Sequence, residues 1–237
     1  MNFISALRSI LFYCGYAPTL IIFSLLGCTL GLLMPYRPRQ QLITTANVII
    51  IWWLRVCCDI KVVVEGRENI PEQPFVALSK HQSSWETFFL QRALTPVSTI
   101  LKKELLLIPF FGWGLAMTRP ISINRSNPKE ALRTVLRQGK KRLEEGNNVL
   151  IYPEGTRMGH GQVGNYTRSG AALAISAEAP ILPIAHNAGS YWPAHRFIKQ
   201  AGTIHVIIGK PIDTHGKTSK ALTEEVKTWI ETRLSQL

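Results

Sequence analysis

The chain of 237 residues is long enough for one α/β domain with a substantial core and an appendage, and too short for two large domains. Its formal net charge is +12, and the excess of Lys and Arg is concentrated between residues 97 and 168. Such a field attracts acidic lipid headgroups, a phosphorylated substrate or an acidic carrier. No basic run is interleaved with stacking aromatic residues, which argues against a nucleic-acid partner.

The N-terminal part of the chain is apolar. Residues 9–36 carry no charge and, as a helix, can cross the roughly 30 Å hydrocarbon core of a bilayer. Residues 40–54 form a second uncharged run that is short for a span and contains tryptophans suited to an interface. We expect this run to be half-inserted or packed beside the first helix, after a turn at residues 35–39. A cleaved signal peptide or a lipoprotein site at Cys28 is the alternative, but the apolar run continues to Met34, which favours a permanent anchor.

From residue 61 onward, short β-rich runs alternate with helical stretches. We expect strands at residues 61–66, 75–80, 97–101, 120–124, 148–152, 181–185 and 203–208. We expect helices at residues 84–93, 170–178 and 220–234, and a mixed apolar segment at 105–117. This alternation predicts an α/β fold with a mixed, mostly parallel sheet flanked by helices and with active-site groups on loops at strand ends. The chain then divides into membrane-anchoring helices at 1–58 and an α/β domain at 59–237.

The clearest helix signal lies between Asn127 and Gly146. Asn127 is the expected N-cap, Pro128 the first helical residue and Glu130 the reciprocal capping partner, while Gly146 follows the last turn. One apolar face is formed by Leu132, Val135, Leu136 and Leu143. The basic residues of this helix form either a solvated face or a contact with a membrane surface. In the last predicted helix we expect burial of Leu222, Val226, Trp229, Ile230 and the stem of Arg233.

A histidine and a carboxylate lie five residues apart in the segment from His81 to Glu86. His81 follows a predicted strand and precedes a predicted helix, so its side chain can project into a cleft. On an ideal helix, residues five apart differ in direction by about 140°, so the pair meets only if His81 precedes the helix and Glu86 lies in its opening turns. The carboxylate then fixes the imidazole tautomer and leaves the other nitrogen as a general base for a hydroxyl. An exposed histidine with an incidental glutamate is the alternative.

A second motif, Glu154–Arg157, follows the strand predicted at residues 148–152. Gly155 permits close backbone approach, Thr156 offers a hydroxyl, and Arg157 offers a planar guanidinium that matches phosphate oxygens. Glu154 can orient Arg157 or bind a substrate hydroxyl. A purely structural turn is the alternative.

Two further cations, Lys103 and Arg125, lie at the ends of predicted strands. Each is either a surface charge or part of an anion pocket shared with Arg157. Because the active-site groups of this fold gather at strand ends, the positions favour the shared pocket.

Other kinds of site find little support. The glycines in residues 159–164 match a dinucleotide fingerprint literally, but they do not directly follow a strand, and Glu178 lies in a predicted helix. We expect instead a glycine loop beside the site. No zinc-peptidase spacing or glycine-flanked serine elbow occurs. Asp59 and Asp213 are the only aspartates, and all four cysteines precede residue 59, which argues against an Asp-based metal cluster and a thiol nucleophile.

In combination, the motifs resemble the glycerolipid acyltransferase family of the 1-acyl-sn-glycerol-3-phosphate acyltransferase type. The resemblance covers about residues 60–215 and rests on ordered blocks at His81–Glu86, Lys103–Pro109 with Gly112–Arg125, Glu154–Arg157 and Ile181–Ile184. It implies that His81 is the catalytic base with Glu86 as its charge-relay partner, and that an apolar segment around Pro183 helps to shape acyl binding. It also implies no metal and no prosthetic group, and a phosphate site made by Lys103, Arg125, Glu154, Gly155, Thr156 and Arg157.

The chain departs from the family pattern at two positions. Glu86 stands where Asp is commoner, although some bacterial members also use Glu, so the relay must be made by a side chain that is one methylene longer. Asn124 stands where members often have Asp before the arginine equivalent to Arg125. A charge pair to Arg125 from that position is therefore not expected.

The reaction that the resemblance implies transfers an acyl chain from acyl-CoA or acyl carrier protein to the free sn-2 hydroxyl of lysophosphatidic acid, giving phosphatidic acid in phospholipid biosynthesis. Arg37, Arg39 and Arg55 near the apolar segments favour a catalytic side facing the cytoplasm at a bacterial inner membrane. Acylation of another lysolipid, such as a lyso-ornithine lipid, is the nearest alternative. A noncatalytic lipid-binding membrane protein is the other, and the intact pair of His81 and Glu86 argues against it.

Overall fold

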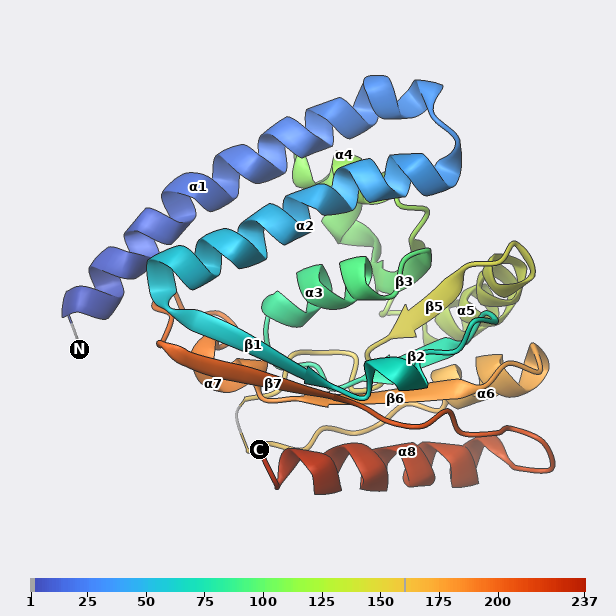
Figure 1. The fold of residues 1–237 in the computed structure, drawn as a ribbon. Coiled ribbons are helices and arrows are strands. Elements are labelled where there is room, and N and C mark those ends of the chain that lie inside the picture. Colours follow the sequence, from blue (N-terminus) through green and yellow to red (C-terminus); the bar gives the residue numbers. More distant parts are fainter. Residues whose placement is uncertain (1–2, 160) are drawn as a thin grey trace.

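The computed structural model describes residues 3–159 and 161–237, which contain a seven-stranded sheet in the order β1-β7-β6-β2-β5-β3-β4 (Figure 1). The strands are β1 Ile60–Glu65, β2 Val76–Ser79, β3 Val97–Lys102, β4 Ile121–Ile123, β5 Asn148–Ile151, β6 Ile181–His186 and β7 Gly202–Ile208. Neighbouring strands run parallel, except that β6 and β7 pair antiparallel. The predicted α/β fold with a mixed, mostly parallel sheet is therefore confirmed.

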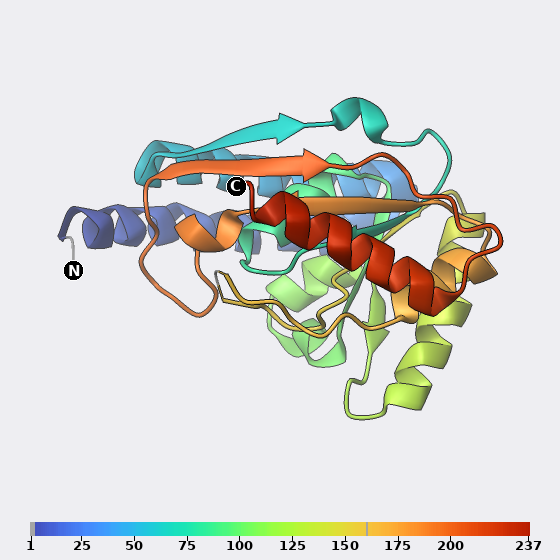
Figure 2. The ribbon, with the colours of Figure 1, turned by 90° about the horizontal axis from the view of Figure 1, so that it is seen from below.

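Helices cover both faces of this sheet. They are α1 Phe3–Cys28, α2 Tyr36–Cys58, α3 Trp85–Ala93, α4 Phe111–Ala116, α5 Pro128–Glu144, α6 Ser169–Ser176, α7 Ala188–Tyr191 and α8 Ser219–Leu234. Short 3-10 segments occur at η1 Leu30–Leu33, η2 Arg67–Asn69 and η3 Lys103–Leu107. One hydrophobic cluster joins the sheet to α1, α2, α3 and α7, and a second joins it to α5, α6 and α8. Figure 2 shows α8 lying across the face opposite to α1 and α2.

The side chains of each central strand alternate between these two clusters, as the period of a strand requires. In β2, Ala77 belongs to the cluster with α3, while Val76 and Leu78 belong to the cluster with α8. The alternation continues past the end of β2, so the side chain of Lys80 points towards α8 and the side chain of His81 points towards α3. The site depends on this difference.

The two N-terminal helices are both long and apolar enough to cross a membrane, by length and composition. They pack against each other, as predicted for the second run, but the apolar window of α1 is 17% buried and that of α2 is 44% buried. Gln40 and Asn47 of α2 donate hydrogen bonds to the carbonyl oxygens of Val97 and Phe88. The described residues before and after position 58 therefore share a hydrophobic cluster, because the buried face of α2 is joined to the α/β part.

The turn between these helices differs in position from the expected one. Helix α1 ends at Cys28, and η1 and Met34 lead to α2, which begins at Tyr36 with Pro35 as its N-cap. Arg37, Pro38 and Arg39 lie in the first turns of α2 rather than in the connection. A proline in the first turn lacks an N–H group that would be unpaired there in any case, so Pro38 is compatible with the helix.

Capping of α5 agrees with the prediction. The Asn127 side chain accepts a hydrogen bond from the Glu130 N–H and donates one to the Glu130 carboxylate, and Pro128 is the first helical residue. The predicted apolar faces needed correction at their edges, because Leu132 is 41% exposed, and on α8 Trp229 is half-buried and Arg233 is exposed.

Candidate active site

The candidate site lies where the carboxyl ends of parallel strands meet. Strands β2 and β5 are paired in parallel, with Leu78 opposite Ile151, so the segments that leave them start side by side. One segment carries His81 and the other carries Glu154–Arg157. The structure therefore brings the two predicted motifs to one edge of the sheet, as expected for this fold class.

The histidine and the carboxylate of the first motif are in contact. His81 precedes α3, and Glu86 lies in the first turn of α3, so the predicted placement is confirmed. The Nδ1 atom of His81 is 2.8 Å from Oε1 of Glu86, which also accepts hydrogen bonds from the N–H groups of Gln82 and Ser83. The longer side chain of glutamate thus reaches the imidazole.

The environment of Glu86 keeps its carboxylate charged. Burial alone raises the pKa of Glu86, but the hydrogen bond from His81, the nearby rings of His186 and His81, and the Ser83 N–H together hold this pKa below its usual value. Oε1 of Glu86 accepts a hydrogen bond from the Nδ1–H group of His81. The other ring nitrogen, Nε2, therefore keeps its lone pair. That nitrogen has no partner among the described residues, and His81 lines a cavity.

The imidazole of His81 is held between its carboxylate partner and an aromatic ring. Tyr152, which follows β5, stacks on it with ring centroids 4.2 Å apart and an interplanar angle of 19°. The Tyr152 hydroxyl is buried without a hydrogen-bond partner among the described residues. Burial, and then the charge of Glu86, raise the pKa of this hydroxyl well above its usual value. The stack therefore restricts the orientation of the base, and Tyr152 stays neutral.

A cavity of about 200 Å³ opens in front of His81 and runs between α3, β3, α4 and α1. Much of its lining is apolar, from Tyr16, Phe88, Ile100, Leu101, Leu105, Phe111 and Leu115, and the polar residues Ser84, Thr87, Gln91 and Thr99 also line it. Arg125 and Arg157 line it as well, so cationic groups and apolar surface flank the histidine. Such a cavity suits a molecule with an anionic group and a hydrocarbon chain.

Within the second motif, the backbone turns sharply at Gly155. Its φ angle is +68°, a value that favours glycine, and its N–H donates to the carbonyl of Tyr152. Thr156 is exposed, and Arg157 is half-buried with a buried Nε atom that has no partner among the described residues. Burial lowers the pKa of Arg125, Glu104 raises it, and the charge of Arg157 lowers it, so the two guanidinium groups act on each other electrostatically.

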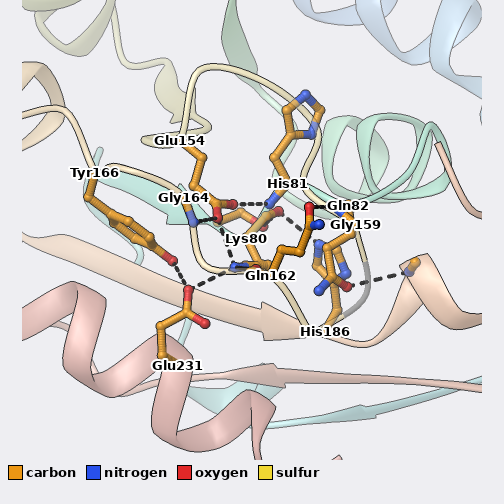
Figure 3. Close-up of polar contacts among 12 residues, drawn as sticks. Lys80, His81, Gln82, Glu154, Gly159, Gln162, Gly164, Tyr166, His186 and Glu231 are labelled. Atoms are coloured by element: carbon orange, nitrogen blue, oxygen red, sulfur yellow. Dashed lines mark hydrogen bonds and ion pairs between the residues drawn. The ribbon is translucent and has the colours of Figure 1, made fainter. Parts of the chain in front are cut away.

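Glu154 is placed differently from the substrate contact that the sequence suggested. Its side chain is fully buried, and Oε1 accepts hydrogen bonds from Lys80 Nζ and the Gly164 N–H, while Oε2 accepts one from the His81 N–H (Figure 3). Both oxygens are therefore used inside the protein. Glu154 holds the two motifs together and does not pair with Arg157.

Expectations about two other site residues change, and the one about Asn124 holds. Lys103 lies exposed in η3 and does not line the cavity, unlike Arg125. Pro183 is buried in β6 close to Gly209 and on the side of α8, so it cannot shape an acyl site in front of His81. Asn124 accepts hydrogen bonds from Ser126 and shapes the local turn, so no charge pair to Arg125 comes from this position.

Several residues that surround the motifs were missed from the sequence. Lys80, Tyr166 and Glu231 form a buried polar network beneath the motifs, and Tyr152 stacks on the base. A charged residue at the end of the apolar strand before His81 was the available signal for Lys80. Its partner Glu231 comes from α8, and no local pattern links two positions so far apart.

His186 is another buried group that the sequence did not single out. Its Nε2 atom bonds to the Lys80 carbonyl at 2.9 Å, and its Nδ1 accepts the Ala188 N–H, so the ring is neutral with the proton on Nε2. Burial lowers the pKa of His186; the charges of Glu86 and Glu154 raise it, and the ring of His81 lowers it. The ring supports the backbone of Lys80 from below.

The described residues contain no group of three or more His, Cys, Asp or Glu that could hold a metal ion. The glycines of residues 159–164 lie in the loop between β5 and α6, and this loop returns beside the site through the bond from Gly164 to Glu154. The side-chain chemistry available is therefore a base with its carboxylate partner, two cations and an apolar cavity.

These features suit an anionic molecule with an apolar chain, and the chain belongs to the acyltransferase family, whose sequence model matches residues 61–187. It is an acyltransferase enzyme. Over its whole length it is 43% identical to the 1-acyl-sn-glycerol-3-phosphate acyltransferase of Pseudomonas aeruginosa, of which it covers 94%. It is also 28% identical to the yeast protein of the same name from Saccharomyces cerevisiae, over 86% of this chain and 71% of that protein.

A solved structure shares the fold. The crystal structure of the 1-acyl-sn-glycerophosphate (LPA) acyltransferase PlsC from Thermotoga maritima superposes with a TM-score of 0.81 at 22% sequence identity, covering 97% of this chain and 94% of that one. The likeness includes the N-terminal helices, because the superposition extends over nearly the whole chain.

Proposed function

We propose that this enzyme transfers an acyl chain from acyl-CoA or acyl carrier protein to the sn-2 hydroxyl of lysophosphatidic acid, giving phosphatidic acid. The observation that carries the proposal is the contact between His81 and Glu86 at the mouth of a cavity that also presents Arg125 and Arg157. The similarity to proteins named 1-acyl-sn-glycerol-3-phosphate acyltransferase supports the choice of acceptor.

In the proposed mechanism, Nε2 of His81 removes the proton of the acceptor hydroxyl as its oxygen attacks the thioester carbonyl. The new C–O bond forms, the C–S bond breaks, and the imidazolium returns the proton to the departing thiolate. Glu86 holds the tautomer and stabilises the imidazolium through the 2.8 Å contact with Nδ1. No covalent enzyme intermediate is needed, and the step needs no metal ion.

Arg157 and Arg125 would bind the acceptor phosphate, since a guanidinium matches phosphate oxygens and its positive charge is always present. Thr156 and the turn at Gly155 would shape the same pocket, and Lys103 would contribute only as an exposed charge near its rim. The apolar wall between α3 and α4 would hold an acyl chain.

Membrane attachment would use the outward side of α1 and the neighbouring η3–α4 segment. Helix α4 packs against α1, and large apolar side chains are exposed on both, including Leu7 and Leu11 on α1 and Leu107 and Trp113 near α4. We infer that this side faces the lipid of a bacterial inner membrane and that the catalytic part lies in the cytoplasm. In spheroplasts, external protease should leave the α/β part intact, and its cleavage would contradict this orientation.

The decisive experiment compares the purified full-length wild type with His81→Ala, using labelled acyl-CoA and acyl carrier protein as donors. His215→Ala is the matched control, because His215 is an exposed histidine that forms an ion pair with exposed Asp213, away from the cavity lining. With lysophosphatidic acid as acceptor, we expect loss of about 10²–10⁴-fold in turnover for His81→Ala and none for the control.

The same assay tests the acceptor. Lysophosphatidic acid is compared with a 1-acylglycerol, which lacks the phosphate, and with a lyso-ornithine lipid. If the wild type prefers a phosphate-free acceptor, the assignment of Arg125 and Arg157 to a phosphate site is wrong, while the role of His81 as the base can still hold. Equal activity of wild type and His81→Ala would overturn the catalytic proposal.

A further inference from the structure

The charge of Lys80 lies inside the protein, on the opposite side of β2 from His81. Its side chain is fully buried, and Figure 3 shows its ammonium group and the imidazole of His81 extending away from each other. The ammonium donates to Oε1 of Glu154 at 2.8 Å, to the carbonyl of Gln162 at 3.0 Å and to Oε1 of Glu231 at 2.8 Å. An ammonium group has three N–H bonds, and each has an acceptor here.

Stability alone does not account for this arrangement. Desolvating an ammonium and two carboxylates costs several kcal/mol per ion, and well-packed apolar side chains of similar volume are often as stable or more stable. The ammonium group instead connects segments that are far apart in the sequence.

Lys80 links two parts of the glycine-containing loop that carries Arg157. Glu154 lies near the start of this loop, and Gln162 and Gly164 lie beyond Arg157, before α6 begins at Ser169. Lys80 binds Glu154 and Gln162, and Glu154 in turn accepts the Gly164 N–H. The ammonium group thus links two parts of the loop, one on each side of Arg157.

The same network reaches the base from its backbone side. Oε2 of Glu154 accepts the His81 N–H at 3.0 Å, and the His81 carbonyl accepts the Met158 N–H at 2.8 Å. A displacement of Glu154 would therefore move the backbone of His81 and the loop that carries Arg157 together.

Helix α8 supplies the remaining partner. Oε1 of Glu231 accepts hydrogen bonds from both Lys80 and the Tyr166 hydroxyl, each at 2.8 Å, and its side chain is 19% exposed. The C-terminal helix is thereby fixed to the same ammonium group as the loop and the base.

We propose that Lys80 is a positioning residue. Its ammonium group, held by Glu231 of α8, fixes the carboxylate of Glu154, and Glu154 in turn keeps Arg157 and His81 in the relative positions that allow both to act on the same acceptor molecule. Lys80 acts through Glu154 and touches no substrate. The kinetic part of this inference rests on the proposed function, whereas its structural part concerns the loop and the backbone of His81.

The principal variant is Lys80→Met, which keeps the length of the side chain and removes its three donors. Glu231→Gln is the milder variant, because it leaves Lys80 and Glu154 in place and should fold even if Lys80→Met does not. Glu225→Gln is the control, since Glu225 lies on the same helix and makes an exposed ion pair with Lys217.

Hydrogen exchange on the full-length proteins gives a readout that does not depend on the substrate. We expect the amides of Met158, Gly164 and His81 to exchange about tenfold faster in Lys80→Met, and less so in Glu231→Gln, while Glu225→Gln matches the wild type. Unchanged exchange at these amides in both network variants overturns the inference, whichever lipid the enzyme acylates.

The kinetic readout separates positioning from a general loss of folded protein. A loss of folded enzyme lowers the apparent kcat equally for all acceptors and leaves KM unchanged. Positioning predicts that KM for lysophosphatidic acid rises about tenfold in Lys80→Met, that KM for the acyl donor is unchanged, and that preference over a 1-acylglycerol falls. A wild type inactive on lysophosphatidic acid would refute the proposed function, while the exchange result would still decide the role of Lys80.

Discussion

Adjacent residues at the end of β2 occupy two very different environments. Lys80 faces α8, where each of its three N–H groups has an acceptor within the protein, and His81 faces a cavity, where Nε2 has no partner among the described residues. The alternation of a strand separates the two side chains, and the Glu154 carboxylate connects them through the His81 N–H. A fully hydrogen-bonded ammonium group on one side is thus linked to an imidazole with an unpaired nitrogen on the other.

Removing the charge next to the base should have the largest effect. Glu86→Gln keeps the size of the side chain but loses the carboxylate that orients and stabilises the imidazolium, so we expect turnover to fall by about 10³-fold. The measurement is kcat with lysophosphatidic acid, and Glu65→Gln, on the exposed edge of β1, is the control. Turnover equal to that of the control would mean that catalysis does not need the carboxylate of Glu86.

Replacing Arg157, which lines the cavity, should weaken binding of the acceptor. Arg157→Lys keeps the charge but loses the planar pair of donors, so KM for lysophosphatidic acid should rise by about 10-fold to 100-fold. Steady-state kinetics with both substrates checks this, with exposed Arg168→Lys as the control. An equal rise in KM for the acyl donor would show that Arg157 does not discriminate between the substrates.

The buried ring of His186 should make folding sensitive to acid. Since the pKa of His186 is lowered by burial, the unfolded chain binds more protons, so the stabilisation is complete above the ordinary pKa of about 6.5 and is lost as the pH falls below it. The free energy of unfolding should fall by at most about 1.4 kcal/mol per pH unit from this group. Urea unfolding in detergent at pH 7.5 and about 5.5 should show a smaller change in His186→Gln; an identical change would contradict the prediction.

The smallest effect is expected from removing the hydroxyl of Tyr152, whose ring stacks on His81. Tyr152→Phe keeps the ring on His81 and removes a buried hydroxyl without a partner, so turnover should be unchanged and stability should rise by about 1 kcal/mol. Tyr152→Ala, which removes the stack as well, should lower turnover. A fall in kcat for Tyr152→Phe without a change in stability would instead mean that the hydroxyl contacts the substrate.

Local patterns predicted much of this site, because its central contact is local. Five residues separate His81 from Glu86, and the start of α3 between them places the carboxylate beside the ring. The capping of α5 at Asn127 and Pro128 was predictable for the same reason. The meeting of the two motifs followed from the rule that parallel strands end at one edge of a sheet.

The errors concern direction and long-range partners. Glu154 was expected to face a substrate, yet Lys80 and the His81 N–H use both of its oxygens. Pro183 was placed near the acyl chain, but the alternation in β6 turns it towards α8. Neither assignment could be made without knowing which face of the sheet each helix covers.

The sequence by itself determined the order of elements, the α/β class, the apolar N-terminus and the contact between His81 and Glu86. These depend on periodicity, capping and short spacings, which act between near neighbours. Only the tertiary structure decided that α2 is partly buried, that Lys80 forms an ion pair with Glu231 and that Arg125, rather than Lys103, lines the cavity. Those outcomes depend on contacts between distant segments, because burial and ion pairing are properties of the packed chain.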